Sequence, residues 1–295
     1  MGIIKAAKLA FDYLRYDEDG NVEATQRAVD GVDLDIQAGE FVAVLGHNGS
    51  GKSTFAKHIN ALLLPTEGTI WIDGIDTSKE SELWKVRQKA GMVFQNPDNQ
   101  IIGTSVEEDV AFGPENKNIE PEKIRKIVET VLRKVKLWDR RKASPSILSG
   151  GQKQRLATAD ALAGLPACLV LDEPTAMLDP DSRKEVINIV KELNRKEGMT
   201  IILITHHTDE VVDADRIVLM KDGKIIGDDI PKKIFADYEL LKKAKMDIPP
   251  VVELGMRLEK QQIGLEGPVL QEQEMIEKIV KLYRSKCGGK KDAAR

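Results

Sequence analysis

One segment limits the possible folds more than any other, because it joins a strand, a glycine-rich turn and a helix without a gap. The apolar run Phe41–Leu45 is followed by the turn Gly46–Gly51, and a helix is expected from about Lys52 to Leu63. A short apolar run bounded by turn residues is typical of a strand that is buried on both faces. Such strands occur mainly in sheets that helices cover, so the segment favours an α/β fold.

The rest of the chain repeats this alternation of strands and helices. Loosely alternating apolar and polar residues over 4–36, with a turn at Asp19-Gly20-Asn21, predict an antiparallel N-terminal sheet. Further strands are predicted at Ile70–Ile72, Leu169–Leu171 and Thr200–Ile204, and further helices at Pro121–Val135, Gln152–Ala163 and Arg183–Asn194. This order implies a mainly parallel sheet wrapped by helices.

Composition and charge narrow the possible partners. The 295 residues suffice for one large α/β domain with a small extension. The net charge of −4 gives no indication of a basic surface that would bind nucleic acid. No apolar run approaches the ~20 residues that span a bilayer. We therefore expect any membrane role to come through a partner protein.

The turn after the first apolar run matches the phosphate-binding pattern Gly-x4-Gly-Lys-[Ser/Thr]. Its glycines let several backbone N–H groups point at phosphates, and the following helix adds the positive end of its dipole. Lys52 is suited to the β- and γ-phosphates of a nucleotide, and the Ser53 hydroxyl to Mg²⁺. The candidate nucleotide-binding residues are Gly46, His47, Asn48, Gly49, Ser50, Gly51, Lys52, Ser53 and Thr54.

Two adjacent acids, Asp172 and Glu173, follow the apolar run Leu169–Leu171. Successive side chains of a strand point in opposite directions, so the two carboxylates are expected to do different work. We expect Asp172 to hold Mg²⁺ through water and Glu173 to orient and polarise an attacking water molecule. An isolated Asp-Glu pair is typical of a solvated turn, but its position downstream of a phosphate loop favours hydrolysis. His206 is a candidate to contact the γ-phosphate and to fix Glu173.

The segment Leu148-Ser149-Gly150-Gly151-Gln152 supplies a second pattern. Taken with the phosphate loop, the acids at 172–173, Met177-Leu178-Asp179-Pro180 and Thr205-His206, it resembles the ATP-binding-cassette ATPases from about residue 4 to 228. The resemblance implies a P-loop NTPase cassette with an N-terminal antiparallel β subdomain. It places the nucleotide-binding domain at 4–228, a helical subdomain at about 96–165 and a C-terminal extension at 229–295.

The same resemblance assigns roles to further residues. Gln95 matches the glutamine that senses Mg²⁺ and the transport partner, and Tyr13 resembles the aromatic residue that stacks on adenine, with Tyr16 as a competitor. Asp179 is similar to the residue that couples two sites across a dimer. Family members work as head-to-tail dimers, in which the signature segment of one chain faces the γ-phosphate held by the other. The candidate residues of that segment are Ser149, Gly150, Gly151 and Gln152.

A narrower resemblance comes from residues 93–100 and 108–116, which look like the ATPases of energy-coupling factor transporters, importers of vitamins and other micronutrients. Residues 46–49 and 177–180 look like the first of the two paralogous ATPases. The resemblance implies a heterodimer with a second, related ATP-binding subunit, a membrane scaffold (T) subunit and a substrate-capture (S) subunit. The chain would then be peripheral, at the cytoplasmic face of the cell membrane, with 95–102 contacting the scaffold.

Several alternatives remain open at this point. A homodimeric ATPase of a cobalt or nickel importer would share residues 95–116. Translation-type relatives carry two cassettes in one chain, and DNA-maintenance relatives split the cassette with a long coiled coil; neither feature is found in this sequence. A P-loop kinase or GTPase would not explain residues 148–152.

Two features of the sequence stand apart from this assignment. The apolar stripe at Ile276, Ile279, Val280 and Tyr283 indicates a helix that either packs on its own domain or forms a dimer contact, as the C-terminal region does in the resembling group. Asp160 occupies a position where the family usually has a small residue.

Overall fold

The computed structural model describes residues 2–261, 263, 265 and 269–288. Its strands are β1 (Ile4–Tyr16), β2 (Val22–Ile36), β3 (Phe41–Leu45), β4 (Glu67–Ile72), β5 (Ile75–Asp76), β6 (Ala90–Val93), β7 (Cys168–Asp172), β8 (Thr200–Thr205), β9 (Arg216–Lys221) and β10 (Lys224–Asp229). Its α-helices are α1 (Lys52–Ile59), α2 (Leu83–Lys89), α3 (Val106–Asn116), α4 (Pro121–Lys134), α5 (Gly150–Ala163), α6 (Pro180–Glu197), α7 (Pro231–Ala236), α8 (Tyr238–Ala244), α9 (Pro250–Lys260) and α10 (Glu272–Gly288). Short 3-10 helices are η1 (Glu80–Glu82), η2 (Pro97–Asn99), η3 (Trp138–Arg140), η4 (Pro145–Ile147) and η5 (Thr208–Val211).

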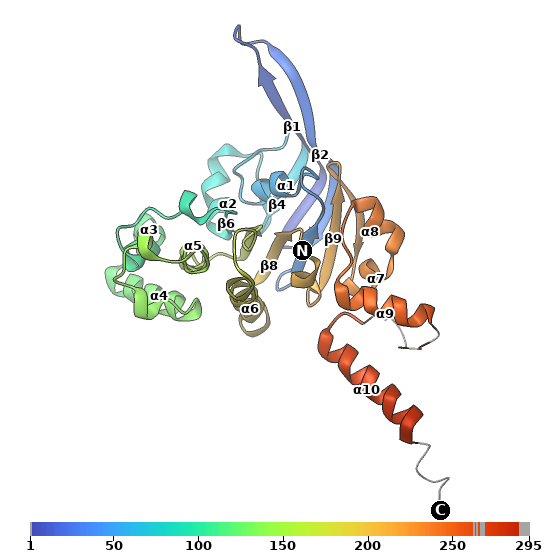
Figure 1. Cartoon of the computed structure of the whole chain (residues 1–295). Helices are drawn as coiled ribbons and strands as arrows, with labels where there is room; N and C mark the ends of the chain where they lie inside the picture. Colours follow the sequence, from blue (N-terminus) through green and yellow to red (C-terminus); the bar gives the residue numbers. More distant parts are fainter. Residues whose placement is uncertain (1, 262, 264, 266–268, 289–295) are drawn as a thin grey trace, which may run out of the picture.

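Two sheets form the body of the molecule. The first has the order β2-β1-β4-β5 with antiparallel pairing, which confirms the antiparallel N-terminal sheet. The long β1–β2 hairpin continues beyond the body of the molecule, as Figure 1 shows. The second sheet has the order β10-β9-β3-β8-β7-β6, and all its neighbours are parallel except the β9–β10 pair. The mainly parallel sheet predicted from the alternation is thus confirmed.

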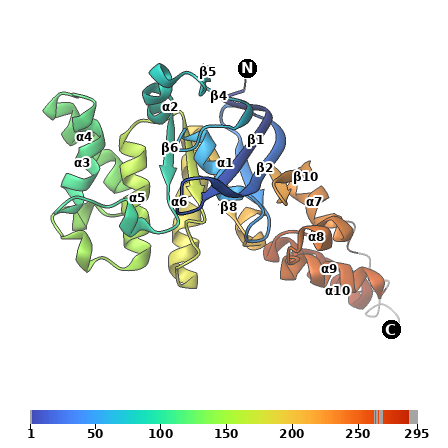
Figure 2. The ribbon, with the colours of Figure 1, turned by 90° about the horizontal axis from the view of Figure 1, so that it is seen from above.

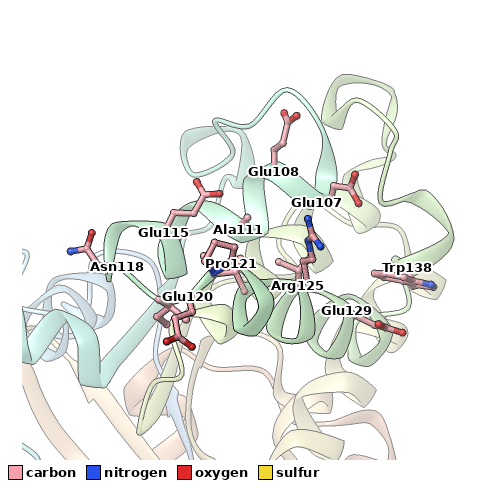
Figure 3. A pocket seen from close by; sticks show the side chains of 13 residues that line it. Glu107, Glu108, Ala111, Glu115, Asn118, Glu120, Pro121, Arg125, Glu129 and Trp138 are labelled. Atoms are coloured by element: carbon pink, nitrogen blue, oxygen red, sulfur yellow. The ribbon is translucent and has the colours of Figure 1, made fainter.

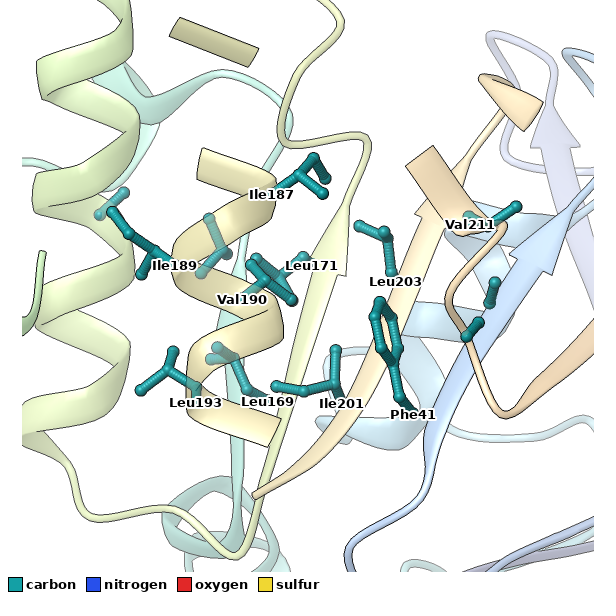
Figure 4. Close-up of a cluster of buried hydrophobic side chains, with 14 of the residues drawn as sticks. Phe41, Leu169, Leu171, Ile187, Ile189, Val190, Leu193, Ile201, Leu203 and Val211 are labelled. Atoms are coloured by element: carbon teal, nitrogen blue, oxygen red, sulfur yellow. The ribbon is translucent and has the colours of Figure 1, made fainter. Parts of the chain in front are cut away.

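The central strands of the second sheet contribute side chains to two separate cores. Every residue of β3, β7 and β8 is buried. Phe41, Ala43 and Leu45 belong to one apolar cluster, whereas Val42 and Val44 belong to the other, as the two-residue period of a strand requires. Figure 4 shows the first cluster, in which Val190 and Leu193 of α6 pack beside Leu169, Leu171 and Ile201. Each fully buried side chain of this size stabilises the fold by ~1.5–3 kcal/mol.

Helices α3, α4 and α5 lie together at one end of the molecule, and α7–α10 lie at the other end (Figures 1 and 2). Helix α4 buries Ile124, Val128, Val131 and Leu132 and leaves Ile127 half-buried, which confirms the predicted apolar face. Within the described residues, no helix combines the length and the apolar composition needed to cross a membrane.

Helices α1 and α6 differ most from the predicted ranges, for local reasons. Helix α1 ends at Ile59 and not near Leu63, because Ala61 adopts a left-handed φ of 53° that a helix cannot contain. Helix α6 spans Pro180–Glu197 and is longer than the predicted Arg183–Asn194. Asp179 caps its start by accepting two backbone N–H bonds, and Gly198 ends it at a φ of 67°.

The apolar stripe of α10 is exposed in the single chain. The exposed fractions are 54% for Ile276, 41% for Ile279, 40% for Val280 and 69% for Tyr283. Of the two alternatives for the stripe, packing on its own domain is therefore wrong for these four side chains. Met275, near the start of α10, is instead buried in a small cluster with Leu265 and Val269. Residues 289–295 of the predicted C-terminal extension lie outside the described part of the chain.

Candidate functional site

A cavity of about 590 Å³ opens where the phosphate-loop pattern lies, between β3 and α1. It is lined by Tyr13, Gln26, Arg27, Ala28, Asn48, Gly49, Gly51, Lys52, Ser53, Thr54, Gln95, Glu173, Asp222 and Gly223. β3, β7 and β8 are parallel, so the residues that follow them meet at one edge of the sheet. The fold thereby brings the phosphate loop, Glu173 and His206 together from segments far apart in the sequence.

The loop needs glycine where other chain segments approach it closely. Gly51, which precedes α1, has a φ of +98°, and a Cβ there would lie 2.3 Å from the Ala28 carbonyl oxygen. Gly46 has a φ of +157°, and its Cβ would lie 2.3 Å from the Met220 carbonyl oxygen. Residues that carry a side chain rarely adopt such backbone conformations, and both distances are too short for a real Cβ atom. These glycines let the loop fold tightly against β2 and β9.

Lys52 is held at the centre of this loop. Its side chain is 3% exposed, and its Nζ donates to the carbonyl oxygens of Gly46 at 2.8 Å and His47 at 3.1 Å. The same Nζ lies 3.7 Å from Glu173 Oε1. Burial lowers the pKa of Lys52, while the carboxylates of Glu173 and Asp172 oppose that shift. The ammonium group of Lys52 is thus fixed in a buried position, and a bound anion would stabilise its positive charge there.

Ser53 and Asp172 meet beside Lys52. The Ser53 Oγ donates to Asp172 Oδ1 at 2.8 Å. Asp172 is 6% exposed, and burial raises its pKa although this hydrogen bond acts in the opposite direction. A buried carboxylate with a raised pKa is stabilised in its charged form by a cation, and a hydroxyl with a carboxylate oxygen suits Mg²⁺. The two residues therefore fit a magnesium ion.

Glu173 is the residue on which the other polar groups converge. Gln95 Nε2 lies 3.4 Å from Glu173 Oε2, and His206 Nδ1 lies 3.4 Å from the same oxygen. Glu173 has a φ of 47°, an uncommon conformation for a residue with a side chain. Its backbone N–H donates to Ile204 O at 2.8 Å, which holds this turn against β8. Strained backbone that the surroundings maintain is frequent at functional sites.

The structure distinguishes the two candidate tyrosines. Tyr13 lines the cavity, and its hydroxyl lies 3.4 Å from Thr54 Oγ1. Tyr16 is 57% exposed and does not line the cavity. Of the two, only Tyr13 is placed to meet a ligand bound at the loop.

The signature residues lie away from the cavity of their own chain. Ser149 caps α5: its Oγ accepts from the Gln152 N–H at 3.3 Å, and Gln152 Oε1 accepts from the Ser149 N–H at 3.0 Å. Gly151 is packed against Ser182 so closely that a Cβ would lie 2.6 Å from the serine side chain. Asp179 caps α6. None of Ser149, Gly150, Gly151, Gln152 and Asp179 lines the cavity, and neither do Gly46, His47 and Ser50.

Sequence reasoning missed five lining residues. Gln26, Arg27 and Ala28 come from β2, and Asp222 and Gly223 from the turn between β9 and β10. Backbone bonds join the two segments to each other and to the loop: Asp30 N–H donates to Gly223 O at 2.9 Å, and Gly223 N–H donates to Ser50 O at 3.0 Å. No local pattern marks these positions, because they reach the cavity through tertiary pairing.

A larger cavity, of about 1080 Å³, lies between α3 and α4. Its lining shares no residue with the cavity at the phosphate loop. Figure 3 shows carboxylates on both helices, among them Glu107, Glu115 and Glu129. Glu129 is paired with Arg133 at 2.8 Å and Glu107 with Arg141 at 3.8 Å, so basic residues of the chain itself offset much of the charge.

Comparisons with known proteins agree with the geometry of the loop. The ABC transporter family model matches residues 29–176. The chain is 50% identical over 280 residues to the energy-coupling factor transporter ATP-binding protein EcfA1 of Clostridium novyi, with 95% of this chain and 98% of the relative covered. It is 51% identical over 277 residues to the protein of that name in Caldanaerobacter subterraneus, covering 94% of this chain and 98% of the relative.

Solved structures give the same result for the fold. Clostridium perfringens cbiO1, described as part of the ABC transporter complex cbiONQ, has a TM-score of 0.72 and 35% identity, covering 88% of this chain and 99% of that one. The ATP-binding cassette MJ0796, solved as a dimer in a post-hydrolysis state with ADP and Pi, has a TM-score of 0.68 and 33% identity. That match covers 77% of this chain and 98% of MJ0796.

Proposed function

This chain belongs to the ABC transporter family, as an ATP-binding subunit of an energy-coupling factor transporter, and we propose that Lys52 binds ATP and Glu173 drives its hydrolysis. The observation that carries the proposal is the convergence of Lys52, Gln95 and His206 on the Glu173 carboxylate at the edge of the phosphate cavity. The chain is an ATPase of a transporter, so its chemistry is phosphoryl transfer to water.

The cavity supplies the groups that ATP requires. Backbone N–H groups of the loop and the start of α1 face the phosphates, and Lys52 adds a fixed positive charge. Tyr13 also lines the cavity, and its aromatic ring can stack on adenine. Ser53 and Asp172 would hold Mg²⁺, with Gln95 as a further ligand. When bound, the ion neutralises charge on the β- and γ-phosphates.

Glu173 is suited to the water-activating role by its position. Its carboxylate accepts a proton from water as the water oxygen attacks the γ-phosphorus, and the bond from that phosphorus to the β–γ bridging oxygen breaks. ADP leaves with the bridging oxygen, and the second product is inorganic phosphate. Gln95 and His206 both contact Oε2 of Glu173 and restrain its side chain, so that the water is held in line for attack.

Hydrolysis takes place between two cassettes in this proposal. Ser149 caps the start of α5, and the capping box leaves the N–H groups of Gly150 and Gly151 as those in the first turn that it does not use. This helix end suits an anion, yet it lies outside its own chain's phosphate cavity. A head-to-tail dimer brings this helix end to the γ-phosphate of the opposing cassette. The MJ0796 cassette, solved as a dimer bound to ADP and Pi, supports the dimeric state of this proposal. We propose a second, related ATP-binding subunit as the partner, and the exposed stripe of α10 as part of the dimer contact.

The transport partners are proposed from the segment that follows Gln95. Ile102 is 63% exposed, and Asp98 is exposed with its carboxylate 2.7 Å from Lys153 on α5. Gln100, in contrast, bonds internally to Ala157 O at 2.8 Å. A membrane scaffold subunit that docks here could move the signature helix and Gln95 together. The scaffold and a substrate-capture subunit would place this chain peripherally at the cytoplasmic face of the membrane, as the ATPase of a micronutrient importer.

Two substitutions separate binding from hydrolysis. Glu173→Gln keeps the shape of the side chain but removes the base, so ATP affinity should persist while kcat falls on the order of 10²–10⁴-fold. Lys52→Ala should instead weaken ATP binding by about 10–100-fold, the value of a hydrogen-bonded charge. Glu192→Gln on the outer side of α6 makes the same chemical change at a 61% exposed side chain and should alter neither quantity. Near-normal steady-state hydrolysis by Glu173→Gln would contradict the assignment.

A further inference from the structure

A buried carboxylate outside the cavity connects the two loops that carry Glu173 and His206. Glu210, on the short helix η5, is 3% exposed. Thr175 Oγ1 donates to Glu210 Oε1 at 2.6 Å, and Thr205 Oγ1 donates to Glu210 Oε2 at 2.8 Å. Thr175 lies two positions after Glu173, and Thr205 immediately precedes His206. One side chain thus uses both of its oxygens to hold the segments that follow β7 and β8.

The two threonines that bind Glu210 are themselves buried, and one of them makes a further hydrogen bond. Thr175 is 0% and Thr205 1% exposed. The Thr205 Oγ1 also accepts from the His207 N–H at 3.0 Å, which fixes the backbone on the far side of His206. The orientation of His206 therefore depends on Thr205, and that of Thr205 on Glu210.

A third element, α6, takes part in the same cluster. Arg183 Nε lies 3.7 Å from Glu210 Oε1, and Arg183 Nη1 lies 3.3 Å from His207 Nδ1. Burial raises the pKa of Glu210, while its hydrogen bonds to the two threonines and the Arg183 charge act in the opposite direction. A buried carboxylate with this set of partners has a fixed position, because loss of any partner would leave its charge poorly compensated.

We propose that Glu210 is a positioning residue for hydrolysis: it locks the loop of Glu173 to the loop of His206 so that the two side chains meet at the attacking water. The inference rests on the proposed roles of Glu173 and His206. A contact of 3.4 Å between residues that directly follow β7 and β8 requires that the ends of these two strands keep a fixed relative position. Glu210 supplies that restraint without touching the nucleotide.

The test compares kcat with ATP affinity in the assembled transporter complex. Glu210→Ala should lower kcat by about 100-fold, the cost of a small misplacement of catalytic groups, and leave the ATP Kd within about threefold. Glu210→Gln keeps one oxygen that accepts a hydrogen bond and gains an amide N–H that can donate to a threonine hydroxyl. This variant should therefore recover most of the lost kcat. Rescue by the amide is not expected of a residue that acts only through its charge.

Single hydroxyl deletions keep the test decisive if Glu210→Ala does not fold. Thr175→Val removes the single hydrogen bond to Glu210, and Thr205→Val removes the bond to Glu210 together with the one from the His207 N–H. Each variant should lower kcat by about 3–30-fold with little change in ATP Kd. The control is Thr200→Val, at the opposite end of β8. Thr200 is 1% exposed, and its hydroxyl accepts from the Gly39 N–H at 2.9 Å. This control also removes one buried threonine hydrogen bond, but far from Glu173, so it should leave kcat unchanged.

The outcomes separate this inference from the proposed function. If Glu173→Gln hydrolyses ATP normally, the proposed function fails. If Glu173→Gln is inactive but a folded Glu210→Ala keeps wild-type kcat, only the role of Glu210 is overturned. The role is also overturned if Glu210→Gln is as slow as Glu210→Ala, or if Thr200→Val slows hydrolysis as much as Thr205→Val does.

Discussion

The close approach of the phosphate loop to β2 predicts a specific cost for Gly51→Ala. A Cβ at Gly51 would lie 2.3 Å from the Ala28 carbonyl oxygen and 3.3 Å from Gly223 Cα, at a φ of +98°. The left-handed backbone costs a residue with a side chain ~1–2 kcal/mol. The forced shift of the neighbouring backbone adds ~1–3 kcal/mol, so the free energy of unfolding should fall by about 2–5 kcal/mol in total. Ala28 also lines the cavity, so its displacement should weaken ATP binding about tenfold or more.

Gly198→Ala supplies the matched control for this prediction. Gly198 ends α6 at a φ of +67°, and a Cβ added there would meet no neighbouring atom within 4 Å. It therefore bears the backbone cost of about 1–2 kcal/mol without a clash, and it should not alter ATP affinity. Urea unfolding without nucleotide and titration with a fluorescent ATP analogue measure the two effects. Equal destabilisation of both variants, together with normal ATP binding by Gly51→Ala, would refute the packing argument.

Three further predictions concern surfaces and charges away from the loop. Asp98→Lys should weaken co-purification with the membrane scaffold and leave hydrolysis by the isolated dimer intact; normal docking would disprove the role of this surface. Burial and the neighbouring Asp109 carboxylate raise the pKa of Asp160 well above 3.8, so the folded state keeps a proton that the unfolded state releases. The free energy of unfolding should therefore fall as pH rises above that value, and Asp160→Asn should reduce this slope in urea titrations at several pH values. Ile279→Asp on α10 should raise the dimer dissociation constant about 10–100-fold in sedimentation experiments without lowering Tm.

The parts of the fold that can be predicted are those whose signal is local. The strand Phe41–Leu45 is apolar at every position because both of its faces are buried, and this is visible in the sequence. The phosphate loop and the acids at 172–173 follow such strands directly, so their meeting at one sheet edge follows from parallel topology. Helix ends are less predictable: the end of α1 depends on the conformation of Ala61, which no pattern encodes.

The parts that cannot be predicted depend on tertiary contacts. Ala28 and Gly223 line the cavity only because β2 and the β9–β10 turn pack on the phosphate loop. Glu210 lies in a short helix whose sequence gives no sign that its carboxylate binds Thr175 and Thr205. Asp160 is unusual for its position in the family, but its burial beside Asp109 emerges only from the packing of α3 on α5.

The central claim is that each ATP is cleaved between the phosphate loop of one cassette and the signature helix of the other. The most direct measurement is the nucleotide bound at each loop of the two-ATPase complex when this chain carries Ser149→Arg. Ser149 lies outside its own chain's cavity, so ATP should still bind at Lys52 of the mutated chain, while hydrolysis at the loop of the opposing subunit stops. Loss of ATP binding at the mutated chain's own loop, with normal turnover at the opposing one, would contradict the account.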